Sequence, residues 1–428
     1  MTSLVVTPAP GGLSGRLRVP GDKSISHRAL LLAARAEGTS PITGLSGGAD
    51  VSATLRAVQA FGAAVERAAD GTVRVTGAEP HEPETVIDVG NSGTGIRLLA
   101  GWAAGIDGLT VLYGDASIAR RPMGRVVEPL RAMGARIDGR QEGRLPPLVV
   151  RGGRLSGIDY RLPVPSAQVK SALLLAGLSA SGPTTVHETV PTRTHTEQML
   201  AACGARIDVD GASVTVHPGP LQATRFTVPA DPSQAAFWVV AACIIPGSDL
   251  TLEDVYVGPR RAGFVEVLQR MGADVQLVDH DPVATVAHIR ARYSPLVGTD
   301  VGGTEIPALI DEIPVLAVAA AFARGVTTFR DAAELKVKES DRIATMAAAL
   351  GAVGATVEAR PDGLVVTGSA GRPLAGGRID SAGDHRVAMA LAVAGLAAAA
   401  PVEITGWEAV ATSYPGFEED LRSCRPSE

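Results

Sequence analysis

Residues 19–34 read VPGDKSISHRALLLAA, a stretch typical of a strand end, a glycine-containing turn and then a largely apolar helix. The first turns of that helix carry Lys23, Ser24, Ser26 and Arg28. A helix N-terminus presents unpaired backbone N–H groups and the positive end of the helix dipole. With two cations and two hydroxyls added, the stretch predicts a site for phosphate or carboxylate. Taken alone, it is equally typical of a solvated helix start capped by serine.

The same arrangement, a small or polar turn followed by an apolar helix, recurs along the chain. The turns lie near Gly21, Gly90, Pro165, Asp231, Asp311 and Gly383. The helices that follow them are predicted to run through residues 30–34, 96–104, 169–178, 235–244, 314–322 and 387–399. Because these segments are apolar on nearly every face, we expect them to be buried helices.

A second recurring feature is a Gly-Ala step between a helix and a strand. Its glycines are Gly62, Gly134, Gly204, Gly272 and Gly354, at spacings of 72, 70, 68 and 82 residues (134−62, 204−134, 272−204, 354−272). Glycine at the end of a helix commonly adopts the left-handed conformation that closes it. The sequence therefore predicts a repeated unit of mixed helix and strand, about 70 residues long.

Six such units in 428 residues predict an α/β protein with two domains of three units each. We expect a discontinuous domain of residues 1–20 and 232–428, and a second domain of residues 21–231. The first strand would complete the sheet of the C-terminal half. If the buried helices of each domain are parallel, two facing domains would direct their N-termini at one cleft, where we expect the active site.

Composition limits the class of protein. The net charge of −6 argues against nucleic-acid binding driven by bulk charge. Three isolated cysteines and eight scattered histidines indicate neither a disulfide framework nor a metal site. The N-terminus lacks a signal-peptide pattern, and the apolar runs are shorter than the roughly 18–20 residues of a membrane span. We expect a cytoplasmic monomer without nucleic-acid or membrane partners.

Cationic residues concentrate at the predicted helix starts. They are Lys23, Arg28, Arg97, Arg121, Arg193, Lys338, Arg342 and Arg386. Two carboxylates, Asp311 and Glu339, lie in equivalent places. Each segment alone is as typical of a capped or salt-bridged helix start, and the glycine-rich residues 90–95 match neither a dinucleotide nor an ATP motif. Together they predict group transfer on a substrate with several anionic groups, with the carboxylates moving protons.

Six motifs in this order resemble the 5-enolpyruvylshikimate-3-phosphate synthase family over almost the whole chain. They are residues 21–28 (GDKSISHR), 90–94 (GNSGT), 121–123 (RPM), 166–168 (SAQ), 338–342 (KESDR) and 384–386 (DHR). The resemblance implies a two-domain inside-out α/β barrel, which agrees with the repeats. It also implies enolpyruvyl transfer from phosphoenolpyruvate to the 5-hydroxyl of shikimate 3-phosphate, by addition and elimination, with no metal or organic cofactor. The pathway would be the shikimate pathway to chorismate and the aromatic amino acids.

The resemblance also implies roles for individual residues. Those matched to shikimate 3-phosphate binding are Lys23, Ser24, Arg28, Ser166, Ala167, Gln168, Arg193, Asp311 and Lys338. Those matched to phosphoenolpyruvate binding are Lys23, Gly93, Arg121, Gln168, Arg342 and Arg386. Asp311 would take the proton of the 5-hydroxyl, while Glu339 and Lys23 would move protons at the enol carbon and the leaving phosphate. We expect the domains to close on the ligands and exclude water.

The chain departs from the family pattern at a few positions. Ala167 stands where many members have a second serine, and Leu98 stands where the plant and enteric form has proline. Residues 411–415 (ATSYP) lack the lysine of that form, so we assign no basic contact there. Gly93 leaves room beside phosphoenolpyruvate, so we expect glyphosate to compete at this position.

Two alternative functions share part of this pattern. One is the sister enzyme that transfers enolpyruvyl to UDP-N-acetylglucosamine and shares the fold. That family usually uses a loop cysteine as an acid, and the corresponding residues 119–122 read ARRP here. The other is a non-catalytic anion-binding protein on the same scaffold, against which the presence of Lys23, Asp311 and Glu339 argues.

Overall fold

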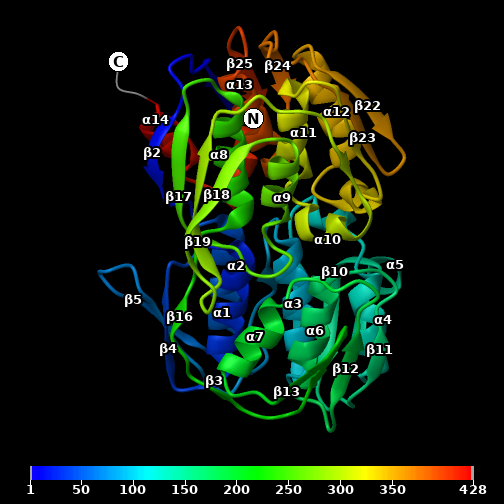
Figure 1. Ribbon diagram of the computed structural model, residues 1–428. Coiled ribbons are helices and arrows are strands. Elements are labelled where there is room, and N and C mark those ends of the chain that lie inside the picture. The colour runs from blue at the N-terminus through cyan, green and yellow to red at the C-terminus, as the bar shows by residue number, and fades with distance from the viewer. Residues whose placement is uncertain (1, 426–428) are drawn as a thin grey trace. The chain divides into compact units, whose positions relative to one another are not determined.

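The computed structural model describes residues 2–425, which form two compact units (Figure 1). Unit 1 comprises the residues up to Pro20 and from Pro229 onward, and unit 2 comprises Gly21–Val228. The second boundary lies three residues before the expected one (231 − 228). The reason is hydrogen bonding, because Ala230 N–H donates to the carbonyl of Asp254 and Asp231 N–H donates to the carbonyl of Pro20, both at 2.9 Å. These bonds attach the connecting segment to unit 1.

Unit 2 is built around buried apolar helices. They are α1 (Lys23–Arg35), α3 (Gly93–Ala104) and α6 (Ala167–Gly177). Around them lie α2 (Ala49–Ala60), α4 (Gly124–Ala132), α5 (Arg140–Gly143), α7 (His195–Ala202) and the 3₁₀ helix η1 (Ile118–Arg120). Helix α3 packs against both α1 and α6, and the three run alongside one another in Figure 1.

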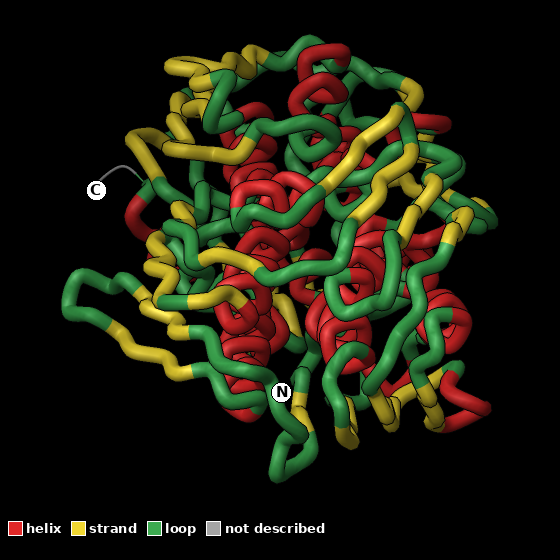
Figure 2. Tube along the Cα trace, turned by 90° about the horizontal axis from the view of Figure 1, so that it is seen from below, coloured by secondary structure: helices red, strands yellow, loops and turns green. Residues whose placement is uncertain are grey.

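Strands cover these helices from outside, as Figures 1 and 2 show. The first sheet has the order β16 (Phe226–Thr227), β4 (Thr39–Thr43), β6 (Val73–Thr76), β5 (Ala64–Arg67). The second has the order β7 (Ile87–Asp88), β8 (Gly108–Tyr113), β10 (Leu145–Gly152), β9 (Arg136–Gly139). The third has the order β11 (Asp159–Arg161), β12 (Thr184–His187), β14 (Ser213–Val216), β13 (Ile207–Asp210). A small fourth sheet pairs β3 (Ala36–Glu37) with β15 (Leu221–Gln222).

The three larger sheets share one pairing pattern. In each, the first and second strands are parallel and the remaining neighbours are antiparallel. A parallel pair needs a crossover, and α3 joins β7 to β8 just as α6 joins β11 to β12. This repeated βαβ connection places α3 and α6 each within its own repeat, whereas β16, the parallel partner of β4, comes from the far end of the unit.

Unit 1 has the same arrangement of buried helices and outer strands. Its buried helices are α8 (Pro232–Ile244), α11 (Ile313–Phe322) and α13 (His385–Leu396), which pack against one another. The remaining helical segments are α9 (Gly263–Arg270), α10 (Ile306–Leu309), α12 (Arg342–Ala352), α14 (Phe417–Ser423), η2 (Gly303–Glu305), η3 (Ala333–Val337) and η4 (Trp407–Thr412). Every residue of α11 is buried, so tertiary packing on all faces defines this helix.

The first strands of the chain belong to the sheets of unit 1, as expected. One sheet has the order β18 (Asp274–Asp281), β19 (Val286–Arg292), β17 (Asp249–Tyr256), β2 (Ser14–Leu17). Another has the order β20 (Asp300–Val301), β21 (Val326–Phe329), β23 (Gly363–Thr367), β22 (Thr356–Arg360). The last has the order β1 (Ser3–Val6), β25 (Val402–Thr405), β24 (Gly377–Asp380). Here β1 pairs antiparallel with β25, the position that β19 and β23 take in the other two sheets.

The predicted glycine turns are confirmed. Gly62, Gly134, Gly204, Gly272 and Gly354 have φ values of 107°, 110°, 80°, 89° and 88°. Positive φ is unfavourable for residues with a Cβ, so glycine is the residue that ends these helices at low cost. Within residues 2–425, the helices are too short or too polar to span a membrane.

Candidate active site

The N-terminus of α1 carries the first candidate residue. Asp22 caps the helix by accepting a hydrogen bond from Ile25 N–H at 2.8 Å. Lys23 follows, and its Nζ lies 3.1 Å from Oδ2 of the buried Asp50. The Lys23 side chain is 15% exposed, so the ammonium group is held in place yet accessible from solvent. It therefore combines a fixed position with access to a ligand.

Arg28 lies one turn further along α1 and is buried. Its Nε donates to Thr196 Oγ1 at 2.7 Å, and its Nη2 donates to Ser171 Oγ at 2.6 Å. Its Nη1 donates to the carbonyl of Ser24 at 2.9 Å. A guanidinium held on three sides loses little further freedom when it binds an anion.

His27 is a buried neighbour of these two cations. Its Nδ1 lies 2.7 Å from Thr54 Oγ1, and its Nε2 lies 3.3 Å from Ser92 Oγ. Burial, reinforced by the charges of Lys23 and Arg28, lowers the pKa of His27 to about 3. The imidazole is therefore neutral at physiological pH. It links Thr54 and Ser92 through its ring nitrogens and does not act as a third cation.

The N-terminus of α3 brings Gly93 next to Arg121. A Cβ on Gly93 would lie 1.9 Å from Arg121 Nη1, which is too close for both to keep their places. Arg121 is buried on the loop after η1. The absence of a side chain at Gly93 therefore leaves the space that the Arg121 guanidinium occupies.

Arg97 connects the start of α3 to Gln168 and to the loop after Arg121. Its Nη1 donates to the carbonyl of Gly93 and to Gln168 Oε1, both at 2.9 Å, and its Nη2 donates to the carbonyl of Pro122 at 3.1 Å. Gln168 Nε2 in turn donates to Thr94 Oγ1 at 2.8 Å. The family motifs assign no ligand to Arg97, and its contacts explain its presence, because it holds the side chain of Gln168 and the loop that carries Arg121.

The start of α6 and the segment before α7 carry the other candidates of unit 2. Ser166 caps α6, accepting a hydrogen bond from Val169 N–H at 3.3 Å, and Ala167 begins the helix. Arg193 is partly buried in the connection that leads into α7.

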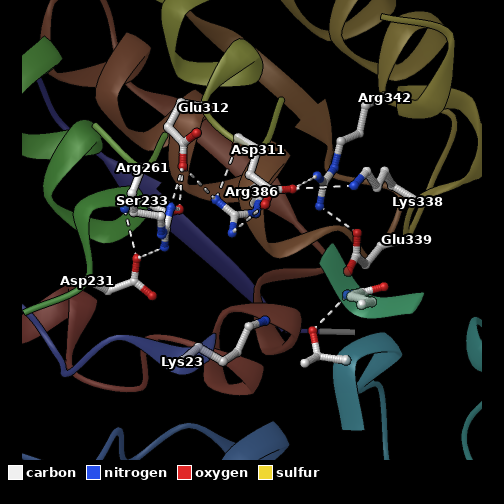
Figure 3. Close-up of polar contacts among 12 residues, drawn as sticks. Lys23, Asp231, Ser233, Arg261, Asp311, Glu312, Lys338, Glu339, Arg342 and Arg386 are labelled. Carbon is white, nitrogen blue, oxygen red and sulfur yellow. Dashed lines mark hydrogen bonds and ion pairs between the residues drawn. The ribbon is translucent and has the colours of Figure 1, made fainter. Parts of the chain in front are cut away.

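In unit 1, Asp311 lies among cationic side chains just before α11 (Figure 3). Its Oδ1 is 3.6 Å from Lys338 Nζ and 3.5 Å from Arg342 Nη1. Its Oδ2 is 3.9 Å from Arg386 Nη2, and its carbonyl accepts a hydrogen bond from Arg386 Nη1 at 3.1 Å. One carboxylate thus lies within reach of three of the cations predicted from the sequence.

Arg342, the first residue of α12, is buried between carboxylates. Its Nε is 2.8 Å from Asp384 Oδ2 and its Nη2 is 2.5 Å from Glu339 Oε2. Burial lowers the pKa of Arg342, but the charges of Asp384 and Glu339 outweigh it and the pKa lies above the usual value. Burial likewise raises the pKa of Asp384, and the Arg342 charge outweighs that and lowers it. The pair therefore stays ionised and fixes Glu339 beside it.

Two residues that the sequence did not indicate, Arg261 and Glu312, lie next to the group around Asp311. Arg261 is buried and contacts Asp231 Oδ1 at 2.7 Å, Ser233 Oγ at 2.7 Å and Glu312 Oε1 at 3.4 Å (Figure 3). Glu312 is fully buried, accepts a hydrogen bond from the Ser233 hydroxyl, and lies 4.0 Å from Arg386 Nη1. The sequence shows Glu312 as one more acidic residue at a helix start, and nothing around Arg261 distinguishes it from a surface arginine.

The predicted residues thus form a group in each unit. Unit 2 holds Lys23, Ser24, Arg28, Gly93, Arg121, Ser166, Ala167, Gln168 and Arg193. Unit 1 holds Asp311, Lys338, Glu339, Arg342 and Arg386. They lie at or just before a helix start or, in the case of Arg28, Arg121, Arg193, Lys338 and Glu339, within a few residues of one. No cluster of three or more potential metal ligands occurs among the residues that the structure describes.

Comparison with known proteins identifies the family. A sequence model described as EPSP synthase (3-phosphoshikimate 1-carboxyvinyltransferase) matches residues 8–421. The chain is 53% identical to the 3-phosphoshikimate 1-carboxyvinyltransferase of Halorhodospira halophila, over 97% of this chain and 94% of the relative. It is 51% identical to that of Desulforudis audaxviator, over 99% of each chain.

Solved structures give the same result. An EPSP synthase structure from Acinetobacter baumannii is 41% identical, with a TM-score of 0.87 over 99% of this chain and 98% of that one. The enolpyruvyl transferase NikO from Streptomyces tendae is 19% identical with a TM-score of 0.79 over 99% of this chain and 97% of that one, a likeness that shows the fold alone. The family match covers nearly the whole chain, and the fold is the two-unit α/β architecture expected from the repeats. The chain therefore belongs to the EPSP synthase (3-phosphoshikimate 1-carboxyvinyltransferase) family.

Proposed function

We propose that this protein transfers the enolpyruvyl group of phosphoenolpyruvate to the 5-hydroxyl of shikimate 3-phosphate, releasing phosphate. Membership of the family supports the reaction. The observation that carries it is the placement of Asp311 within 4 Å of the charged groups of Lys338, Arg342 and Arg386. This group offers several cations to an anionic substrate and one carboxylate that can take a proton.

The reaction has an addition step and an elimination step. In the addition, the 5-hydroxyl oxygen bonds to C2 of phosphoenolpyruvate, its proton leaves, and a proton adds to C3. In the elimination, C3 loses a proton, the C2–O bond to phosphate breaks, and the enol ether double bond forms. We assign the hydroxyl proton to Asp311, and the protons at C3 and on the leaving phosphate to Glu339 and Lys23.

We assign shikimate 3-phosphate to residues of both units. The set is Lys23, Ser24, Arg28, Ser166, Ala167, Gln168, Arg193, Asp311 and Lys338. The contacts of Arg28 support this assignment, because three fixed hydrogen bonds leave a preorganised cation for a phosphate or carboxylate. Ala167 has no side-chain hydrogen-bonding group, so its contribution would come from the backbone at the start of α6.

We assign phosphoenolpyruvate to a second set, which also draws on both units. The set is Lys23, Gly93, Arg121, Gln168, Arg342 and Arg386. Guanidinium groups match the two-oxygen geometry of carboxylate and phosphate and stay charged at any working pH. Glyphosate would compete for this set, and steady-state inhibition that is competitive with phosphoenolpyruvate would support the assignment.

The test measures phosphate release with both substrates and with each one omitted. We expect release only with both, and a loss of about 10²-fold or more in Lys23→Ala and Asp311→Asn, the range typical of lost acid–base and electrostatic groups. Lys336→Ala is the matched control, because Lys336 is an exposed lysine outside the assigned set. Absence of release from the unmodified protein, or full activity in Lys23→Ala, would contradict the proposal.

The alternative acceptor, UDP-N-acetylglucosamine, has less support. Cys203, Cys243 and Cys424 are buried, and burial raises the pKa of Cys203 to about 11 and that of Cys243 to about 12. Neither they nor the loop of residues 119–122 offers the cysteine acid that the sister family usually employs. Replacing shikimate 3-phosphate by UDP-N-acetylglucosamine in the same assay distinguishes the two acceptors.

The proposal also includes a cytoplasmic monomer that acts on small molecules, without nucleic-acid or membrane partners. The acidic net charge of −6 supports the exclusion of nucleic acid. Sedimentation of the purified chain at assay concentration tests the monomer directly.

A further inference from the structure

We propose that Lys170 is a positioning residue that holds the two arginines assigned to shikimate 3-phosphate, Arg28 and Arg193. The inference rests on the proposed function, because it takes those assignments as its starting point. Lys170 itself has no assigned ligand, and its side chain is only 1% exposed.

The Lys170 ammonium group is clamped between two glutamates. Its Nζ lies 2.9 Å from Glu188 Oε2 and 2.8 Å from Glu197 Oε1. The glutamate side chains are 4% and 5% exposed, so three ionisable groups share a site almost closed to water. A buried charge of this kind is retained only when its partners are in place, so the cluster fixes the three segments that supply it.

One branch of the cluster leads to Arg193. Glu188 follows the end of β12, and its Oε1 accepts hydrogen bonds from the backbone N–H of Thr192, at 3.1 Å, and from the Thr192 hydroxyl. The carboxylate therefore bridges Lys170 on α6 and the residue immediately before Arg193. The position of the Arg193 backbone depends on where Lys170 holds Glu188.

The other branch leads to Arg28. Lys170 and Ser171 on α6 face Glu197 and Thr196 on α7, with Ser171 Oγ 2.6 Å from Thr196 Oγ1. Both of those hydroxyls accept hydrogen bonds from the Arg28 guanidinium. The Lys170–Glu197 ion pair thus holds together the pair of helices that orients Arg28.

Removal of the Lys170 charge would leave two carboxylates close together in a buried site. They repel each other and must move apart, take up a proton or admit water. Each response shifts Glu188 or Glu197, and with them the Thr192 and Thr196 contacts. Arg121, assigned to phosphoenolpyruvate alone, lies on a loop held by Arg97, whose Nη2 donates to the carbonyl of Pro122. Gln168, assigned to both substrates, bonds to Arg97 and Thr94 and not to this cluster.

The expected signature is therefore a change in one Michaelis constant and not in the other. Lys170→Met should raise the KM for shikimate 3-phosphate by about tenfold or more, since small misplacements of binding groups have effects of this size. The KM for phosphoenolpyruvate should stay within about twofold of the unmodified enzyme. A purely structural role would lower the amount of active enzyme without separating the two constants.

Thr192→Val provides a second variant in case Lys170→Met fails to fold. It removes the hydroxyl that donates to Glu188 and leaves both ion pairs of Lys170 intact. We expect a rise of about threefold in the same KM, as for loss of one hydrogen bond. The control is Thr185→Val, which removes a hydroxyl pair with Thr215 in the same sheet, away from the Arg193 segment.

The outcomes separate the inference from the proposed function. If the unmodified protein fails to release phosphate from the two substrates, the proposed function is rejected. If it is active and Thr192→Val behaves like Thr185→Val, the inference alone is overturned. Equal rises in both Michaelis constants for Lys170→Met would overturn it as well.

Discussion

At the scale of single residues, burial of a titratable group next to like charges makes native stability depend on pH. His27 has its pKa lowered to about 3 by burial and by the neighbouring Lys23 and Arg28, against 6.5 in the unfolded chain. Below pH 6.5 the unfolded chain therefore binds a proton that the native protein does not. As the pH is lowered from 6.5 to 3, His27 should therefore decrease the free energy of unfolding by up to about 1.4 kcal/mol per pH unit.

A His27→Gln variant should weaken that dependence while keeping a hydrogen-bonding side chain beside Thr54. Urea unfolding at several pH values between 4 and 7 measures the slopes. The exposed His280 gives a matched control, and His280→Gln should leave the slope unchanged. Identical slopes in both variants would show that His27 does not cause the effect.

The approach of Gly93 to Arg121 leads to a second prediction at this scale. In Gly93→Ala the new Cβ would meet the Arg121 guanidinium at 1.9 Å, and the flexible arginine would move instead of the helix. We expect a rise of roughly tenfold in the KM for phosphoenolpyruvate, with little change in stability. Gly182→Ala, which meets no atom within 4 Å, is the control, and equal constants in both variants would contradict the prediction.

At the scale of secondary-structure elements, the glycines that follow the outer helices adopt positive φ values that are unfavourable for other residues. Helix α12 contains Gly351 and is followed by Gly354, which has a φ of 88°. Alanine is favourable inside a helix and unfavourable at positive φ. The two positions should therefore respond in opposite directions to the same substitution.

We expect Gly351→Ala to raise the free energy of unfolding by up to about 1 kcal/mol and Gly354→Ala to lower it by about 1–2 kcal/mol. A Cβ at Gly351 meets nothing within 4 Å, and at Gly354 its nearest neighbour is Ala375 Cβ at 3.6 Å, so steric clashes do not mask the backbone effect. Denaturant midpoints of the two variants check the prediction. A stabilised Gly354→Ala would mean that the turn relaxes to negative φ.

At the scale of the whole molecule, the chain leaves unit 1 after Pro20 and returns at Pro229, so the N-terminal strands complete sheets made by the C-terminal half. Val6 of β1 is fully buried and pairs with Val402 of β25. Its side chain packs close to Gly395 of α13. Strand β1 is therefore part of the core of unit 1, although most of that unit lies more than 200 residues away in sequence.

Val6→Ala should lower the stability of unit 1 by about 2 kcal/mol, the cost of removing buried methyl groups. Hydrogen exchange should speed up in β25 and α13. The neighbouring Val5, 57% exposed on the same strand, gives the control, and Val5→Ala should have a small effect. Faster exchange confined to unit 2 would contradict this account.

Much of the architecture was predictable because it rests on local chemistry that repeats. The apolar helices, their polar starts and the glycines after the outer helices each follow from short-range preferences, and repetition along the chain made the pattern visible. The structure confirms the positive φ at Gly62, Gly134, Gly204, Gly272 and Gly354. The placement of β1 beside β25 also agrees with expectation.

The repeats and the buried helices can be predicted from the amino-acid sequence, and the family motifs indicate the candidate residues at the helix starts. How those residues are held depends on contacts between segments that are distant in the sequence. The contacts of Arg261 with Glu312 and of Lys170 with Glu188 and Glu197 have no signal in the sequence, and Arg97 is visible there only as one more cation at a helix start. The physical reason is that a charged residue favours the surface on its own, and burial becomes favourable only when distant segments supply its partners.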